Sequence, residues 1–238
     1  MMSAVKISRK LHKWLGLAVG IQLFLWSVSG FYMVAVDIGI IHGDMLVKTQ
    51  SPNLGDNIDD VKGMGDVQSR YPEAQRITLT SVLKQPVYVV DGNSDSRLLD
   101  AINGEEISPL DEAHAVAIAE FYYAGDGAVR TAELIRSAPP GEIRFMRLPV
   151  WRVDFDDAWG TSFYIDPKTG KLSSRRHTLW RVFDFLWMLH IMDYDEREDV
   201  NNVPLRIVSA LALVLVISGI WLLFYTLKRK PNPTIDSI

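Results

Sequence analysis

The sequence predicts an α+β membrane protein in which two transmembrane helices flank a domain of two helix-plus-antiparallel-sheet modules. Three observations support this fold class. The 238-residue chain has a long apolar segment near each end, and a weak internal repeat lies between the two segments. Its 48% apolar composition and its mean hydropathy slightly above zero are typical of a soluble domain joined to a few membrane helices.

The first apolar segment, residues 14–36, contains 23 residues without a charge. About 20 apolar residues suffice to cross a bilayer as a helix. A signal peptide has a shorter apolar core that ends at a small-x-small cleavage site, and no such site follows here. We therefore expect an uncleaved anchor. Four basic residues precede it: Lys6, Arg9, Lys10 and Lys13.

The second apolar segment, residues 205–227, is followed at once by Lys228, Arg229 and Lys230. Basic clusters beside membrane spans face the cytoplasm, so residues 1–13 and 228–238 are both expected there. The region between the spans then lies on the opposite side, which for a bacterial inner membrane is the periplasm.

Charge and motif content exclude several classes of function. Residues 37–204 carry 17 basic and 28 acidic residues, and no basic patch is interleaved with aromatics, so nucleic-acid binding is not expected. The absence of cysteine excludes disulfides, thiolate zinc sites, iron–sulfur clusters and covalently attached haem. No nucleophile elbow, phosphate loop, HExxH or dinucleotide fingerprint occurs, so the sequence assigns no enzymatic reaction.

An internal repeat organises the region between the spans. Residues 86–91 are echoed by residues 149–154, and residues 100–108 by residues 166–173, at offsets of 63 and 66 residues. The pattern indicates two copies of one small module. Each copy contains an Asp-x-x-x-Gly segment that suits a hairpin turn, because glycine adopts the positive φ that such turns require.

The two modules, at about 58–110 and 111–174, together form a predicted tandem domain over residues 37–176. Each is expected to open with a helix, at residues 61–71 and 111–123, followed by alternating strand-like segments. The expected strands are residues 77–83, 86–90, 96–101, 132–136, 142–145, 150–155 and 161–165.

Residues 177–195 are expected to form an interfacial amphipathic helix. Its sixteen-residue apolar part rises only about 24 Å, too little to cross a hydrocarbon core of about 30 Å. His190 lies in its apolar stripe and is either a packed, hydrogen-bonded core histidine or a metal or haem ligand. A basic collar, suited to anionic headgroups or to Asp184, is expected at the start of this helix and comprises Arg175, Arg176 and His177.

Several of these segments resemble one known family. The start Leu-His-Lys-Trp-Leu-Gly at residues 11–16, the hairpin PVWRVDF…YIDPKTGKL at residues 149–172 and the Trp-Met-Leu-His segment at residues 187–190 resemble the PepSY-associated transmembrane proteins. The resemblance covers nearly the whole chain. It implies a bacterial inner-membrane protein whose two modules are PepSY-like. Larger members, typically with four spans, resemble haem-containing reductases that pass electrons across the membrane, whereas this chain has two spans.

A b-type haem needs two axial ligands, commonly imidazoles in a dry aromatic pocket. His42 and His190 are both expected near the outer interface and form the predicted ligand pair, for haem b or another metal. His12 lies at the other end of the first span, about 45 Å from His42 along a helix, so it could pair only with a partner subunit or its own copy. His12 could equally be an interfacial anchor. Gly16 and Gly20 provide a small-residue face for close helix packing, either within the chain or in a homodimer.

Three hypotheses about function follow. In the first, the protein binds haem or acts as an accessory component of an electron-transfer system, with a membrane or periplasmic redox partner. In the second, it has no cofactor and captures a peptide or protein by edge pairing of a sheet. In the third, it is a structural subunit of a membrane complex. His114, within Asp111-Glu112-Ala-His114, fits an ordinary amphipathic helix better than a metal site.

Overall fold

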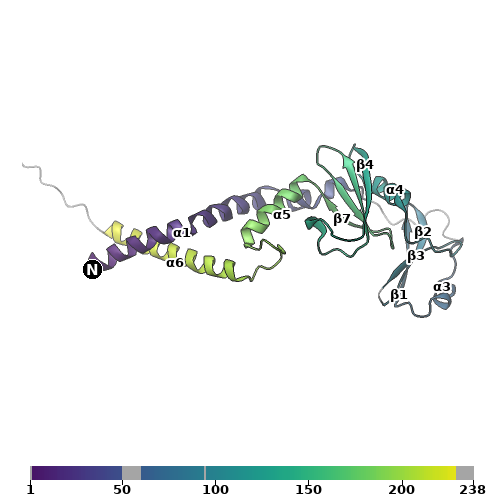
Figure 1. Ribbon diagram of the computed structural model, residues 1–238, viewed down its shortest axis with the longest axis horizontal. Helices are drawn as coiled ribbons and strands as arrows, with labels where there is room; N and C mark the ends of the chain where they lie inside the picture. The colour runs from purple at the N-terminus through teal and green to yellow at the C-terminus, as the bar shows by residue number, and fades with distance from the viewer. Residues whose placement is uncertain (1, 50–59, 94, 229–238) are drawn as a thin grey trace, which may run out of the picture. The chain divides into compact units, whose positions relative to one another are not determined.

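The computed structural model describes residues 2–49, 60–93 and 95–228, which form two compact units (Figure 1). One unit comprises residues 1–36 and 183–238, and the other comprises residues 37–182. The predicted start of the first module at residues 58 and 59, and Arg229 and Lys230 of the second basic cluster, lie outside the described residues.

The first unit contains helices α1 (Met2–Ala35) and α6 (Val203–Lys228) and most of α5 (Thr178–Ile191). At about 1.5 Å per residue, α1 is about 51 Å long and α6 about 39 Å, so both exceed a hydrocarbon core of about 30 Å. Val5–Ala35 and Val203–Lys228 are long and apolar enough to cross a membrane. Their large apolar side chains are exposed, as Ile21 at 76% shows, which suits contact with lipid rather than water.

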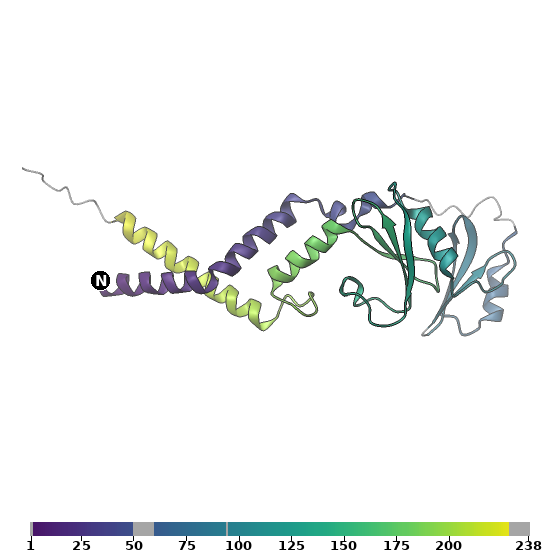
Figure 2. The same cartoon turned by 45° about the horizontal axis from the view of Figure 1, so that its top comes forward.

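Small residues line the contact between α1 and α6, which cross in Figure 2. A Cβ added to Gly16 would lie 3.8 Å from Leu215, whereas one added to Gly20 would meet nothing within 4 Å. Gly16 therefore packs against α6 of its own chain, in the way small residues let membrane helices approach. The homodimer expected on the face of Gly16 and Gly20 stays a prediction.

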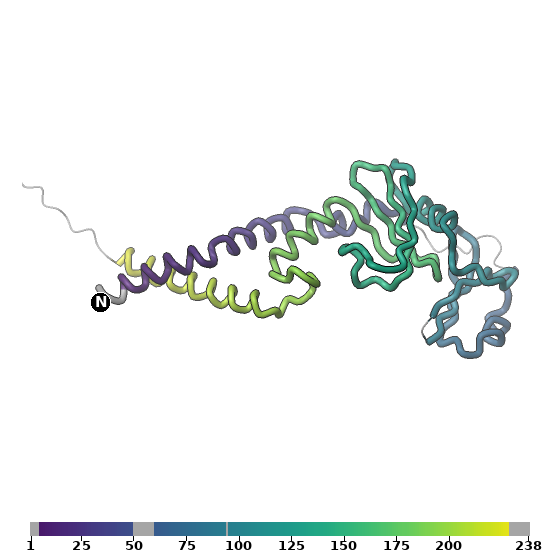
Figure 3. Tube along the Cα trace, viewed as in Figure 1, coloured from purple at the N-terminus to yellow at the C-terminus, as the bar shows by residue number. Residues whose placement is uncertain are grey.

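Helix α5 is joined to α6 by a tight acidic turn, which Figure 3 shows as a reversal of the chain. The Asp193 carboxylate accepts hydrogen bonds from the backbone N–H groups of residues 195, 196, 198 and 199. The side-chain oxygen of Asn202 then accepts from the N–H of Leu205 and caps α6, while its amide nitrogen donates to the carbonyl of Ile191. The acidic run thus shapes the turn.

The second unit contains two antiparallel sheets (Figure 1). The first sheet has the order β1-β2-β3 and the second the order β4-β5-β6-β7. A helix precedes each sheet, so both halves run helix then strands, as the internal repeat predicts. The elements are α3 (Met64–Arg70), β1 (Arg76–Val82), β2 (Gln85–Asp91), β3 (Ser96–Asp100), α4 (Glu112–Tyr122), β4 (Ala128–Ile135), β5 (Val150–Asp156), β6 (Ser162–Ile165) and β7 (Leu172–Arg176).

The predicted hairpin glycines occupy the turns expected of them. Gly104 and Gly170 have φ of +75° and +68°, and their N–H groups donate to the carbonyls of Asp100 and Asp166 at 2.9 and 2.8 Å. A side chain at these φ values is strained, which explains why both copies of the repeat keep glycine there.

The main core forms around α4. Ala115, Ile118 and Ala119 of this helix pack with buried residues of both sheets, including Leu98 of β3 and Phe163 of β6. A smaller cluster lies around Tyr164 and contains Ile135, Ile143 and Val150.

Two expectations about local structure were wrong, and one strand was not anticipated. The strand expected at residues 142–145 is instead a 3-10 turn, η3 (Gly141–Ile143), because Pro139 and Pro140 before it cannot donate to a strand ladder. Strand β7 was not anticipated, because its polar sequence lacks an apolar alternation. Helix α3 starts at Met64 rather than residue 61, after Gly63 as its N-cap.

Candidate functional site

His190 lies in α5 and is held by a serine of α1. Its Nδ1 is 2.7 Å from Oγ of Ser29, which is fully buried. The hydroxyl of Ser29 also donates to the carbonyl of Leu25 at 2.7 Å. A hydroxyl has one proton, so Ser29 accepts from the Nδ1–H of His190. The lone pair of the neutral imidazole is therefore on Nε2.

Aromatic rings surround His190. The indole of Trp187 lies nearly parallel to the imidazole, with ring centroids 6.5 Å apart and an interplanar angle of 9°. The indole of Trp26 is 6.3 Å away, and its Nε1 donates to the carbonyl of His190 at 2.7 Å. Gly30 faces the ring as well, since an added Cβ there would lie 4.0 Å from Cε1. The imidazole of His190 therefore has apolar surroundings and an orientation fixed by its hydrogen bond to Ser29.

His12 repeats this arrangement further along α1. Its Nδ1 is 2.8 Å from Oγ of Ser218 in α6, and this hydroxyl donates to the carbonyl of Leu215 at 2.8 Å. By the same reasoning, His12 carries its proton on Nδ1 and its lone pair on Nε2. The ring packs closely on Gly219, where an added Cβ would come within 3.0 Å of Cε1. The imidazole of His12 thus occupies the space that a side chain at position 219 would need.

The two imidazoles cannot share one iron within a chain. His12 and the Ser29 that holds His190 are 17 residues apart on α1, a separation of about 25 Å along the axis. Sequence reasoning found both histidines but missed Ser29 and Ser218. The available signal was the presence of serine hydroxyls inside the apolar spans, because a hydroxyl in lipid needs a hydrogen-bond partner. Each span has more than one serine, so this signal does not single out Ser29 or Ser218.

His42, the other member of the predicted pair, ends α2 (Ile38–His42) in the second unit. Its side chain is exposed, and its carbonyl accepts from Nε of Arg175 at 2.7 Å. Because His42 and His190 belong to different units, their pairing stays a prediction. Within residues 2–49, 60–93 and 95–228, no group of three or more His, Cys, Asp or Glu side chains could hold a metal ion.

The remaining two histidines have structural roles. His177 was expected in a basic collar but is fully buried, with its Nε2 donating to the carbonyl of Ile41 at 3.1 Å. The turn from β7 into α5 directs it inward, so the collar prediction was wrong for this residue. His114 bonds through Nδ1 to Asp111, the N-cap of α4, at 2.7 Å, which agrees with an ordinary helix.

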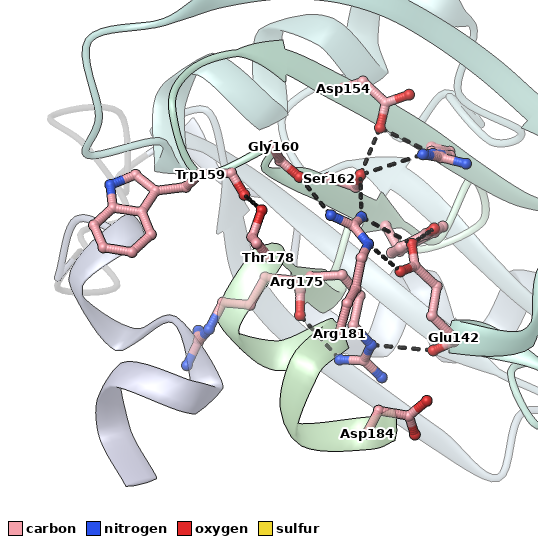
Figure 4. A network of polar contacts seen from close by, with 12 residues as sticks. Glu142, Asp154, Trp159, Gly160, Ser162, Arg175, Thr178, Arg181 and Asp184 are labelled. Carbon is pink, nitrogen blue, oxygen red and sulfur yellow. Dashed lines mark hydrogen bonds and ion pairs between the residues drawn. The ribbon is translucent and has the colours of Figure 1, made fainter. Parts of the chain in front are cut away.

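A polar network joins η3, the second sheet and the start of α5 (Figure 4). Arg181 donates to the Glu142 carboxylate through Nε at 2.7 Å and to Oγ of Ser162 at 3.0 Å. Ser162 in turn donates to Asp154 at 2.6 Å, and the hydroxyl of Tyr164 donates to Glu142 at 2.5 Å. The network fixes η3 against the sheet.

Electrostatics keep this network ionised. Burial opposes ionisation of Glu142, but the hydrogen bonds from Arg181 and Tyr164 outweigh it and hold the pKa of the Glu142 carboxyl below its ordinary value. Burial and the bond to Glu142 raise the pKa of the Tyr164 phenol, so this group keeps its proton. Glu142 and Arg181 therefore form a structural ion pair, with the Tyr164 phenol as a neutral donor to it.

The fold and these sites define a membrane protein with two candidate spans and an α+β domain between them. The sequence profile of the PepSY-associated TM region matches residues 9–236, so the chain belongs to this family. The expected resemblance is thereby confirmed. Comparisons with curated proteins and with solved structures found no match.

Proposed function

We propose that this protein binds b-type haem through His190 and acts as a component of an electron-transfer system of the membrane. The observation that carries the proposal is the hydrogen-bond chain from His190 to Ser29 to the carbonyl of Leu25. Histidines that bind metals usually donate their other ring N–H to a fixed acceptor, which sets the tautomer and the ring orientation. His190 meets this requirement and has Nε2 available as the ligand atom.

The residues around His190 in the first unit are suited to hold one histidine ligand to haem. His190 would ligate through Nε2, Ser29 would orient the ring, and Trp26 and Trp187 would exclude water. The second ligand is proposed to be His42, while His12 would serve only with a partner subunit, including a second copy of the chain. Bound haem supplies a one-electron carrier whose potential depends on its axial ligands and burial.

The proposed topology has both termini in the cytoplasm and the α+β domain in the periplasm of a bacterial inner membrane. The asymmetry of basic residues around the spans supports this orientation. Electrons would pass between a membrane or cytoplasmic donor and a periplasmic acceptor protein. A reporter fused after Ile238 should be active only in the cytoplasm, and activity only in the periplasm would overturn the topology.

The test of haem binding is a reduced-minus-oxidised visible spectrum of the detergent-purified chain from haem-supplied cells, with haem quantified after pyridine extraction. Wild-type protein should hold stoichiometric haem, and His190→Ala should lose it. His42→Ala should lose it too if the pair is intramolecular. His114→Ala, which removes an exposed histidine on α4, is the matched control and should keep it.

A positioning variant sharpens this test. Ser29→Ala removes only the acceptor for Nδ1 and should weaken haem binding by about 10- to 100-fold, as outer-shell changes typically do. Ser27→Ala is its control, because the hydroxyl of Ser27 donates to the carbonyl of Leu23 on the same helix. Colourless wild-type protein, or equal haem in wild type and His190→Ala, would overturn the proposal.

A second candidate function, capture of an extended peptide without a cofactor, is favoured by a cavity of about 720 Å³ in the second unit. Its lining combines Asn93 and Ser96 near the β2–β3 turn with Ser173 of β7, which is an edge strand of its sheet. Edge strands bind peptides through main-chain hydrogen bonds. Peptides retained from a random library by wild-type protein and lost by Ser173→Pro would support this function, and identical retention by both would exclude it.

A further inference from the structure

A basic cavity lies in the second unit at the end of β7 and is separate from the histidine sites of the first unit. It has a volume of about 290 Å³ and is lined by His42, Leu172, Ser173, Ser174, Arg175, Arg176 and Trp180. None of these residues is acidic. The lining therefore combines two permanent positive charges with two hydroxyls and one indole.

Both guanidinium groups are fixed in place by the surrounding chain. Arg175 donates through Nε to the carbonyl of His42 and forms an ion pair with Asp44. Arg176 donates through Nε to the carbonyl of Glu142 at 3.0 Å and through Nη1 to the carbonyl of Arg175 at 2.9 Å. Immobilised guanidinium groups lose little entropy when they bind an anion, and their fork of donors matches phosphate geometry.

The carboxylate of Glu142 bonds to groups other than the cavity arginines. The carbonyl oxygen of Glu142 accepts from Arg176, whereas its carboxylate accepts from Arg181 and Tyr164. Arg175 forms an ion pair with Asp44, and Asp44 does not line the cavity. The lining itself therefore carries the two guanidinium charges and no carboxylate.

Trp180 gives the cavity an aromatic wall beside its positive charges. The guanidinium of Arg176 lies 3.9 Å from the centroid of the Trp180 ring, a cation–π contact. In the sequence, His42 of the lining follows the last residue of α1, a candidate span, by only seven positions. Tryptophan and arginine side by side are typical of the headgroup region of a membrane.

We propose that this cavity binds a phosphate-bearing anion, through Arg175, Arg176 and the hydroxyls of Ser173 and Ser174. The ligand is either the phosphodiester of an anionic phospholipid or a free phosphate. Anion binding here does not require bound haem. The lining includes His42, the proposed second haem ligand, so the test changes the arginines and Ser173 and leaves His42 intact.

The experiment uses the full chain, delipidated in detergent and examined by native mass spectrometry after addition of phosphatidylglycerol or phosphatidylcholine. Wild-type protein should retain phosphatidylglycerol, and Arg175→Gln and Arg176→Gln should each retain at least about tenfold less, consistent with loss of a charge-assisted contact of about 1.4 kcal/mol or more. Arg176→Lys keeps the charge and should lose less. The control is Arg147→Gln, at an exposed arginine of the same unit outside this cavity.

A second arm distinguishes the source of the phosphate group. The melting temperature is measured in sodium phosphate and in sodium chloride at equal ionic strength. A rise in phosphate that disappears in both arginine variants, without retention of phosphatidylglycerol, assigns a soluble phosphate ligand. Retention of phosphatidylglycerol that the arginine variants lose, without a rise in phosphate, assigns the lipid.

Ser173→Leu covers the case in which an arginine variant fails to fold, because it fills the cavity and keeps both charges. It should reduce binding of whichever ligand the wild type takes, while its melting temperature in chloride stays near that of wild type. The proposal is overturned if wild type shows neither response, or if the cavity variants and Arg147→Gln behave alike.

Discussion

Nε2 of His177 donates a hydrogen bond to the carbonyl oxygen of Ile41, and this bond ties the segment after α1 to the junction between β7 and α5. The imidazole is fully buried and packs edge-on against Trp159 with ring centroids 6.2 Å apart. Its Nδ1 has no hydrogen-bond partner in the described part of the chain. The folded protein therefore holds His177 neutral, with its proton on Nε2.

This buried histidine predicts a loss of stability in mild acid. Burial lowers the pKa of His177 below 6.5, and the hydrogen bond to Ile41 only partly offsets that effect. The unfolded chain binds the proton more readily, so the contribution is complete above pH 6.5 and declines as the pH falls toward the folded pKa. The decline should reach up to about 1 kcal/mol over the pH unit below 6.5.

The measurement is the free energy of unfolding in detergent at pH 7.5 and 5.5, for wild type and for His177→Gln. The Gln amide keeps a donor for Ile41 but does not titrate, so the variant should show a smaller decline. Asp157 and Arg181 also act on His177, and they and the other four histidines are the same in both proteins. An equal decline in the two proteins would contradict the prediction.

Gly43 makes the approach of His177 possible, and Gly43→Ala should destabilise the fold. Gly43 has φ +71°, and an added Cβ would lie 3.2 Å from Cδ2 of His177. The left-handed backbone alone costs about 1–2 kcal/mol for a residue with a side chain. Thermal unfolding in detergent checks this. Gly63→Ala is the control, with φ −61° and its nearest contact at 3.7 Å, and should cost less than about 1 kcal/mol.

The sequence predicted most elements because their signals are local. The apolar lengths of the two spans, Asp111 as the cap of α4 and the turn glycines Gly104 and Gly170 each follow from a few neighbouring residues. Partners distant in sequence were not predictable. Ser29 and His190 are 161 positions apart, and nothing in either neighbourhood specifies the other. The sequence placed His177 in a basic cluster because it follows two arginines. Its burial could not be predicted, since it depends on contact with Ile41 of α2, 136 positions away.

The ion pair between Glu142 and Arg181 should contribute measurably to stability. The side chain of Glu142 is 12% exposed and that of Arg181 is 35% exposed. Breaking a fully buried pair costs about 3–5 kcal/mol, and partial exposure of the arginine reduces this, so Glu142→Gln should cost about 2 kcal/mol at pH 7. Tyr164→Phe removes one hydrogen bond and should cost about 1 kcal/mol.

The stability that this ion pair contributes should decrease in acid, because protonation of Glu142 removes its charge. The pKa of Glu142 is lowered in the fold, so its contribution is present above the ordinary value of 4.5 and is lost as the pH falls through the folded pKa. Denaturant unfolding at pH 7 and pH 4 measures it. Glu133→Gln, on the exposed side of β4, should stay within about 0.5 kcal/mol of wild type. A similar cost for both glutamates would remove the ion pair as a source of stability.

The tautomer of His190 can be read directly, whether or not haem is bound. Ser29 commits its proton to the carbonyl of Leu25, so the Nδ1 of His190 must carry the proton that it donates to Ser29. Nitrogen-15 NMR of histidine-labelled, haem-free protein at pH 8 should show a resonance pair with Nδ1 protonated and Nε2 bare. Ser29→Ala removes the acceptor, so the Nε2–H form should appear, whereas Ser27→Ala should leave the spectrum of His190 unchanged. A wild-type His190 protonated on Nε2 would mean that the imidazole is oriented for some other partner and would remove the main support for its role as an axial ligand.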